Sequence, residues 1–194
     1  MEKEDILELV NSLNLQEKIE LDSIPNLDLY MDQVITLFEE KLGHTKRFEG
    51  DKLLTKTMIN NYIKDKLLMP AVKKKYTKEH VLLMILLYDL KQILTIGDIK
   101  SLFGTIIKNG EVDGDLLAEI YQIFLALKVE GAYEFNDEIK KMDENIDSRM
   151  KQLAAVQDME TEQLKSMLQV IILTEKANYY KRLAEKIIDT KINE

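Results

Sequence analysis

The 194-residue sequence has no cysteine, and this absence excludes several kinds of chemistry. Without thiols the chain has no disulfide framework, no thiolate metal site, no thiol sensor and no cysteine nucleophile. The only two histidines, His44 and His80, lie far apart in the sequence, so a shared metal site is not expected and we assign them structural or solvent roles. No glycine-rich phosphate loop, nucleophile elbow or zinc spacing is present. We therefore expect neither an enzyme nor a bound cofactor or metal.

Proline and glycine are also scarce, with two and seven copies, while apolar residues recur three and four positions apart. This combination predicts a mainly α-helical protein. The longest strongly apolar run, Val81 to Tyr88, is far shorter than the roughly 20 residues that span a bilayer. The N-terminus is acidic where a signal peptide would be basic. We expect a cytoplasmic protein with no membrane segment.

Positive charge is concentrated in one part of an otherwise acidic chain. Residues 44–80 contain 10 basic and 4 acidic side chains, whereas residues 1–43 contain 3 and 11 and residues 111–194 contain 11 and 18. One basic segment in an acidic chain is typical of a protein with one face for a polyanion. The alternative is a chance cluster of solvated lysines.

The sequence before this basic segment predicts two helices. The first has apolar positions Ile6, Leu9, Val10 and Leu13. The second follows the break at Ile24-Pro25-Asn26 and ends at Gly43, with one apolar stripe made of Tyr30, Val34, Leu37, Phe38 and Leu42. This stripe should pack on the basic segment's own domain.

The basic segment itself predicts a helix capped by Thr55 and ended by Pro70. Its apolar side includes Ile59 and Tyr62, and Tyr62 is expected to pack inside. Its opposite side presents Lys56, Thr57, Asn60, Asn61 and Lys64. Such side chains bond to phosphates and base edges, although a solvated surface has the same composition.

A short hairpin is predicted after Pro70, over residues 71–76. Lys73, Lys74 and Lys75 lie at its tip, where they would contact phosphates. Thr77 then caps a helix that is apolar all round, typical of a central core helix. Thr95 and Asp98 have capping-box spacing and introduce a further short helix that Gly104 ends.

Residues 54–103 resemble the N-terminal reader of the MerR family of transcription regulators, a winged helix-turn-helix. The likeness lies in four features in order: the tyrosine-bearing helix from Thr55 into Leu67-Leu68, then Pro70, then Lys75-Tyr76-Thr77 as the end of a wing, then Leu94 to Ile99. A larger part of the chain, including Ile24 to Gln33, resembles an uncharacterised family of small bacterial proteins. The first resemblance implies double-stranded DNA as the partner.

Three features depart from the MerR pattern. The predicted wing is shorter and lacks glycine and arginine, and the helix has Thr57 and Asn60 where the family usually has arginines. Weaker or differently specified DNA binding would follow. The lack of cysteine excludes the metal sensing found in some members.

The C-terminal part predicts long helical tracts. One runs from Asp115 to about Tyr133, a second has the repeat Ile139, Met142, Ile146, Met150 and Leu153, and a last helix starts near Thr161. Their apolar stripes are wider than one neighbour can cover, so we expect a homodimer formed by these helices. The competing arrangement folds them back on the reader.

Two further groups of residues have the composition of a catalytic or ligand site. Asp113, Asp115 and Glu119 are more easily explained as an acidic helix start than as a catalytic pair. The aromatic residues Tyr121, Phe124, Tyr179 and Tyr180 are more easily explained as core than as a ligand pocket, and a small-molecule effector stays unknown.

Together these patterns predict a mainly α fold, with a MerR-like winged helix-turn-helix domain over residues 1–110 and a C-terminal α-helical domain over 111–194. The predicted function is sequence-specific transcription regulation. The alternative is a protein-protein interaction module that keeps the winged-helix scaffold without binding DNA.

Overall fold

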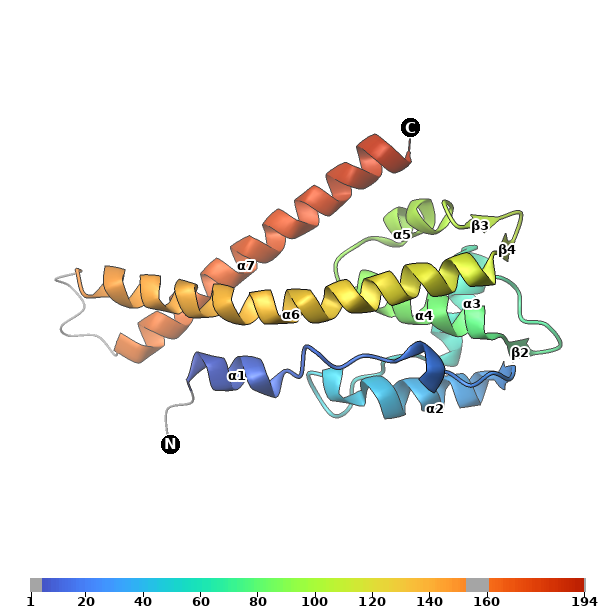
Figure 1. Cartoon of the computed structure of the whole chain (residues 1–194), viewed down its shortest axis with the longest axis horizontal. Helices are drawn as coiled ribbons and strands as arrows, with labels where there is room; N and C mark the ends of the chain where they lie inside the picture. The colour runs from blue at the N-terminus through green and yellow to red at the C-terminus, as the bar shows by residue number, and fades with distance from the viewer. Residues whose placement is uncertain (1–4, 153–160, 194) are drawn as a thin grey trace. The chain divides into compact units, whose positions relative to one another are not determined.

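The computed structural model describes residues 5–152 and 161–193, and these residues are mainly α-helical, as predicted (Figure 1). They form two compact units that alternate along the chain. The first consists of residues 18–125 with 184–193, and the second of 5–17 with 126–152 and 161–183. The predicted boundary after residue 110 falls inside the first unit, so it does not separate the two.

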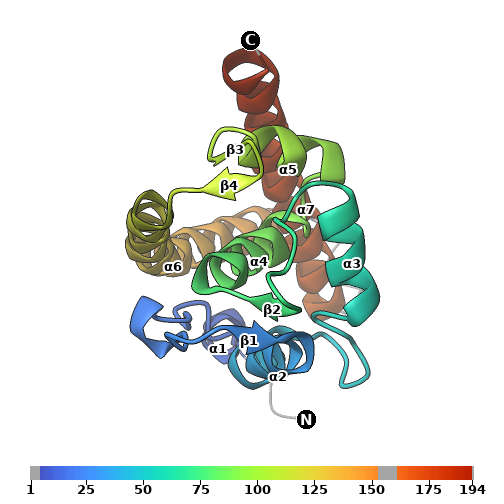
Figure 2. The same cartoon turned by 90° about the vertical axis from the view of Figure 1, so that its right-hand side faces the viewer.

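The first unit contains helices, short strands and turns in an alternating order. They are η1 (Leu21–Ser23), β1 (Leu29–Tyr30), α2 (Met31–Leu42), η2 (Gly43–Thr45), α3 (Lys56–Lys64), β2 (Lys75–Tyr76), α4 (Lys78–Leu90), α5 (Ile96–Phe103), β3 (Ile107–Lys108), β4 (Glu111–Val112), the start of α6 (Gly114–Met150) and the π-helical turn η4 (Ile188–Ile192). Strands β1 and β2 pair antiparallel, with Leu29 opposite Tyr76 and Tyr30 opposite Lys75 (Figure 2).

Helix α4 is the centre of this unit. Its side chains His80, Val81, Leu82, Leu83, Met84, Ile85 and Leu87 are all buried, which confirms the prediction of a central helix apolar all round. Helix α2 contributes Val34, Leu37, Phe38 and Leu42, four of the five positions of its predicted stripe. The fifth, Tyr30, was assigned wrongly: it precedes the helix and its side chain is 54% exposed.

Helix α3 ends earlier than the sequence predicted, at Lys64 instead of Pro70. Lys66 adopts a left-handed backbone (φ 61°), and the Leu67 N–H donates to the Tyr62 carbonyl at 2.8 Å. This bond is the 6→1 link of a Schellman turn, which satisfies a carbonyl at the helix end. Leu67 and Leu68 are therefore buried as part of the turn and not of the helix.

The second unit contains α1 (Ile6–Ser12), most of α6 and most of α7 (Thr161–Ile187). Val10 of α1 is buried together with Ile139, Met142, Ile146 and Met150 of α6, and the half-buried Leu164, Leu168 and Ile172 of α7 pack against them. The sequence predicted two helical tracts over 115–153, but α6 is one continuous helix of 37 residues. Leu153, the last member of the predicted repeat, lies outside the described residues.

Capping boxes begin helices α5 and α1 of the described residues. Thr95 and Asp98 form the predicted capping box at the start of α5, with the Asp98 N–H donating to Thr95 Oγ1 at 3.2 Å. Helix α1 also begins with a capping box, formed by Asp5 and Glu8. Throughout the described ranges, every helix is too short or too polar to cross a membrane.

Candidate nucleic-acid interface

The predicted polar face is present on α3. Thr55 caps the helix by accepting a hydrogen bond from the Met58 N–H at 3.2 Å. Ile59 and Tyr62 point into the core, and burial raises the pKa of the Tyr62 hydroxyl. On the other side, all five side chains named from the sequence are exposed: Lys56, Thr57, Asn60, Asn61 and Lys64. Their spacing of one, three and four residues places them on one side of the helix.

One residue of this face already has an ionic partner. Lys56 Nζ lies 2.7 Å from Asp32 Oδ1 in the first turn of α2, and the two side chains are 61% and 75% exposed. An ion pair this exposed contributes about 0 to 1 kcal/mol and is screened by salt. It therefore links α2 to α3 weakly, and a phosphate can replace Asp32 at little cost.

The predicted hairpin after Pro70 is also present. Val72 and Lys75 exchange backbone hydrogen bonds of 3.0 and 2.9 Å across a two-residue turn. Both turn residues have a left-handed backbone, with φ of 51° at Lys73 and 66° at Lys74. Turns of this kind favour asparagine and glycine, because other side chains pay a steric penalty at positive φ. Both lysine side chains are exposed.

Lys66, at the end of α3, shares the exposure and backbone of these two lysines and was not predicted from the sequence. It is exposed and, like Lys73 and Lys74, has positive φ. In the described residues, positive φ outside glycine occurs at Asn14, Lys66, Lys73, Lys74 and Asn109. Asparagine adopts this backbone at lower steric cost than lysine. A helix-ending signal after Asp65 would have been needed to identify Lys66, and glycine, the usual signal, is missing there.

Lys75 differs from its two neighbours because it is half-buried. Its Nζ lies 5.2 Å from the centre of the Tyr30 ring, directly across the β1–β2 ladder. A cation over an aromatic face is held by the ring's quadrupole. The contact with Tyr30 therefore leaves the half-buried Lys75 less freedom to reach a phosphate than Lys73 or Lys74.

The comparison with known families concerns the part of the chain just described. The sequence profile of the family described as Domain of unknown function (DUF1836) matches residues 19–124, more than half of the chain. The chain belongs to the DUF1836 family. The matched segment nearly coincides with residues 18–125 of the first structural unit, so the DUF1836 domain is a folded unit. No curated protein and no solved structure gives a significant match.

Of the aromatic residues considered as a ligand pocket, Tyr121 and Phe124 are in contact in the DUF1836 domain, with ring centres 6.2 Å apart. Tyr121 is fully buried in the DUF1836 domain, where its hydroxyl donates to the Ile19 carbonyl at 2.7 Å, whereas Tyr179 and Tyr180 of α7 are 60% and 64% exposed. Asp113 Oδ1 accepts from the N–H groups of Asp115 and Leu116 and thus caps α6. Over the residues with described positions, no group of three or more potential ligands is arranged for a metal ion.

Proposed function

We propose that the DUF1836 domain is a winged helix-turn-helix reader of double-stranded DNA and that the protein is a cytoplasmic transcription regulator. The observation that supports this most is the group of exposed lysines with left-handed backbone, Lys66, Lys73 and Lys74. Strained backbone persists where a function needs the side chain. At a positive φ, glycine or asparagine has a lower steric cost than lysine. A lysine at such a position suggests that its positive charge is needed, and an exposed positive charge on a turn can contact a phosphate.

The order of elements supports the same proposal. Strand β1 precedes α2 and α3, and a lysine-tipped hairpin follows whose second strand pairs with β1. Helix α3, with its exposed Thr57, Asn60 and Asn61, is the proposed recognition helix, because short polar side chains can bond to base edges in the major groove. The hairpin is the proposed wing. In this arrangement phosphate contacts position the domain and α3 specifies the sequence.

The test is a titration of labelled duplex DNA at several salt concentrations with K66Q/K73Q/K74Q. Each lost phosphate contact should reduce the slope of log K against log salt by about 0.9, so the triple variant should lower it by about 2 to 3. The control K41Q/K100Q/K108Q removes the same charge from exposed lysines elsewhere in the domain. Equal salt slopes for the two variants would show that Lys66, Lys73 and Lys74 do not contact phosphates. N60A should change sequence preference more than total affinity.

The second candidate function is a protein-protein interaction module that does not bind DNA. The ion pair between Lys56 and Asp32 favours it, because this pair satisfies one cation of the α3 face internally. The net negative charge of residues 111–194 favours it as well. Absence of duplex binding at low salt, where the electrostatic contribution is largest, would select this alternative.

A further inference from the structure

A separate basic pocket lies in the DUF1836 domain between the loop that joins α2 to α3 and the end of α4. Its volume is about 330 Å³, near the lower end of the range for small-molecule sites. The residues that line it are Thr45, Lys46, Arg47, Asp51, Lys52, Leu53, Tyr88, Lys91 and Gln92. Four of these are cationic and one is acidic, in a protein whose net charge is −8.

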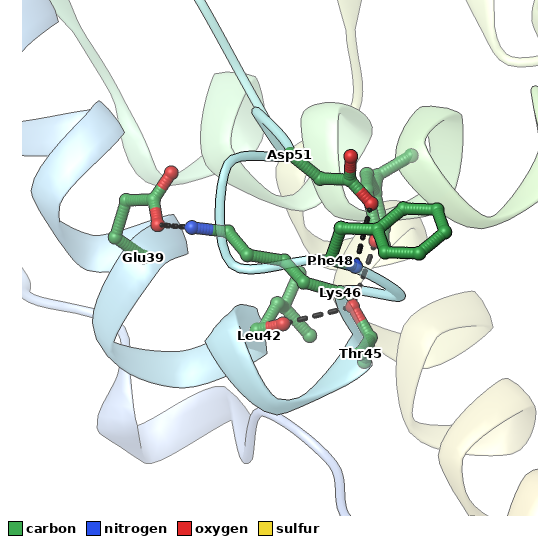
Figure 3. Close-up of polar contacts among 7 residues, drawn as sticks. Glu39, Leu42, Thr45, Lys46, Phe48 and Asp51 are labelled. Carbon is green, nitrogen blue, oxygen red and sulfur yellow. Dashed lines mark hydrogen bonds and ion pairs between the residues drawn. The ribbon is translucent and has the colours of Figure 1, made fainter.

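The loop that forms one wall is held by its own hydrogen bonds (Figure 3). Thr45 Oγ1 donates to the Leu42 carbonyl at 2.8 Å, and this hydroxyl lies 2.7 Å from the Tyr88 hydroxyl of α4. The Phe48 N–H donates to Asp51 Oδ2 at 3.0 Å. The pocket therefore has a preformed wall, and the Asp51 carboxylate is already engaged by the backbone.

The four cations of the pocket differ in their burial and in their partners. Lys46 is paired with Glu39 of α2, as Figure 3 shows. Lys91, just after α4, is half-buried, and its Nζ is 3.4 Å from the Leu53 carbonyl and 5.3 Å from the centre of the Tyr88 ring. Burial lowers the pKa of this amino group, because the charged form loses solvation. An anion in the pocket would compensate that loss. Arg47 and Lys52 are exposed at the rim.

We propose that this pocket binds a small phosphate-bearing molecule through the half-buried Lys91 and the exposed Arg47 and Lys52. The four cations suit a ligand with more than one negative charge, and a guanidinium group can bond two phosphate oxygens at once. A small ligand fits better than the DNA backbone, because the Lys91 amino group lies inside a concave site that a broad duplex surface does not enter. This site does not depend on the proposed DNA-binding function.

The experiment is calorimetric titration of the full chain with inorganic pyrophosphate at constant ionic strength. K91M keeps the apolar stem of the side chain and removes its charge, and K100M makes the same change on the exposed surface of α5. We expect saturable binding that weakens at least about tenfold in K91M and stays within about twofold in K100M. R47Q/K52Q, which changes only exposed rim residues, should also weaken binding, so the test does not depend on whether K91M folds.

Two results would overturn the proposal: no saturable heat with the wild-type chain up to millimolar pyrophosphate, or wild-type affinity for pyrophosphate in both K91M and R47Q/K52Q. Duplex DNA provides a further arm. If K91M weakens duplex binding as much as pyrophosphate binding, the pocket serves the DNA backbone and the small ligand is wrong. If the wild-type chain binds pyrophosphate and no duplex, the pocket stands and the DNA-binding proposal fails.

Discussion

Lys73 and Lys74 occupy the two positions of a hairpin turn at which the chain's other two-residue hairpin has Asn109 and Gly110. The dihedral angles have the same sign in both turns, but a left-handed backbone costs about 1 to 2 kcal/mol per residue for an ordinary side chain. Replacing Lys73 and Lys74 by the residues of the second turn therefore tests the steric cost of the left-handed backbone separately from the contribution of the two charges to DNA binding.

The first prediction uses this difference. K73N/K74G should raise the free energy of unfolding by about 1 to 2 kcal/mol, because both residues then suit the turn. K73Q/K74Q should give no such gain, since glutamine pays the same steric cost. Both variants should lose duplex affinity equally. Urea denaturation and DNA titration measure the two effects, and an unchanged stability in K73N/K74G would show that the turn is not strained.

His80 allows a prediction about pH at the same scale. It is 2% exposed, and its Nδ1 lies 3.1 Å from the Thr77 N–H, which donates to it. Burial lowers the pKa of this imidazole below the ordinary value near 6.5, against weaker opposing effects of the Met69 and Pro70 backbone and of Glu79 and Asp28. The folded state therefore binds a proton less readily than the unfolded state.

The stabilising effect of a neutral His80 is complete above a pH of about 6.5 and is lost as the pH falls from there toward the lowered folded-state pKa. H80Q keeps an acceptor for the Thr77 N–H and removes the titration. Between about pH 7 and pH 5, the free energy of unfolding should decrease more steeply in the wild type than in H80Q. Parallel curves for wild type and H80Q would contradict this.

At the scale of elements, the first turns of α6 belong to the core of the DUF1836 domain. Leu117, Tyr121 and Leu125 are buried there, and the Tyr121 hydroxyl bonds to the Ile19 carbonyl across 102 positions of sequence. This bond joins the beginning and the end of the family's matched segment, residues 19–124. It explains why a domain boundary at residue 110 would remove part of the core.

Y121F should therefore lower the free energy of unfolding by about 1 to 2 kcal/mol, because the buried Ile19 carbonyl loses its donor. Y133F is the matched control on the same helix, since the Tyr133 side chain is 59% exposed. Its effect should stay within about 0.5 kcal/mol. Urea denaturation of both variants measures the difference, and an equally stable Y121F would show that the hydroxyl bond is not structural.

The elements predicted correctly from the sequence are those with a local cause. The helix starts at Thr55 and Thr95 and the burial of α4 could be predicted, because each is determined by residues within a few positions in the sequence. The end of α3 was missed because its left-handed residue is Lys66 and not glycine. The continuity of α6 past Tyr133 could not be predicted because Gly131 lowers helix propensity by about 1 kcal/mol, whereas the burial of Ala132 and Ile139 just beyond it favours a continued helix.

The same limit applies to the candidate sites. The α3 face and the hairpin lysines could be named because they are adjacent in sequence. The basic pocket could not, because its walls, the loop after α2 and the end of α4, meet only in the folded domain. Nothing in the spacing of Arg47, Lys52 and Lys91 indicates that the three line one cavity.

At the scale of the whole molecule, α7 has little burial for a helix of 27 residues. The structure gives no fully buried residue in α7, from Thr161 to Ile187. One side packs on α6 through Leu164, Leu168 and Ile172. Other apolar side chains are more than half exposed: Met167, Val170, Ile171, Tyr179, Tyr180 and Leu183. Exposed apolar surface of this kind usually marks an association site.

We predict that a second copy of the chain covers this surface of α7 in a homodimer. A dimer would also suit a reader whose α3 face has few cations, because the second DNA contact then becomes effectively intramolecular. V170E/I171E introduces two charges at positions that are 63% and 53% exposed, so the monomer should fold while the dimer dissociates. V170L/I171L keeps the surface apolar and should remain dimeric. Sedimentation at micromolar concentration with circular dichroism as the folding check measures both. A monomeric wild-type chain at that concentration rules the dimer out, and a dimeric V170E/I171E variant places the interface away from these two residues.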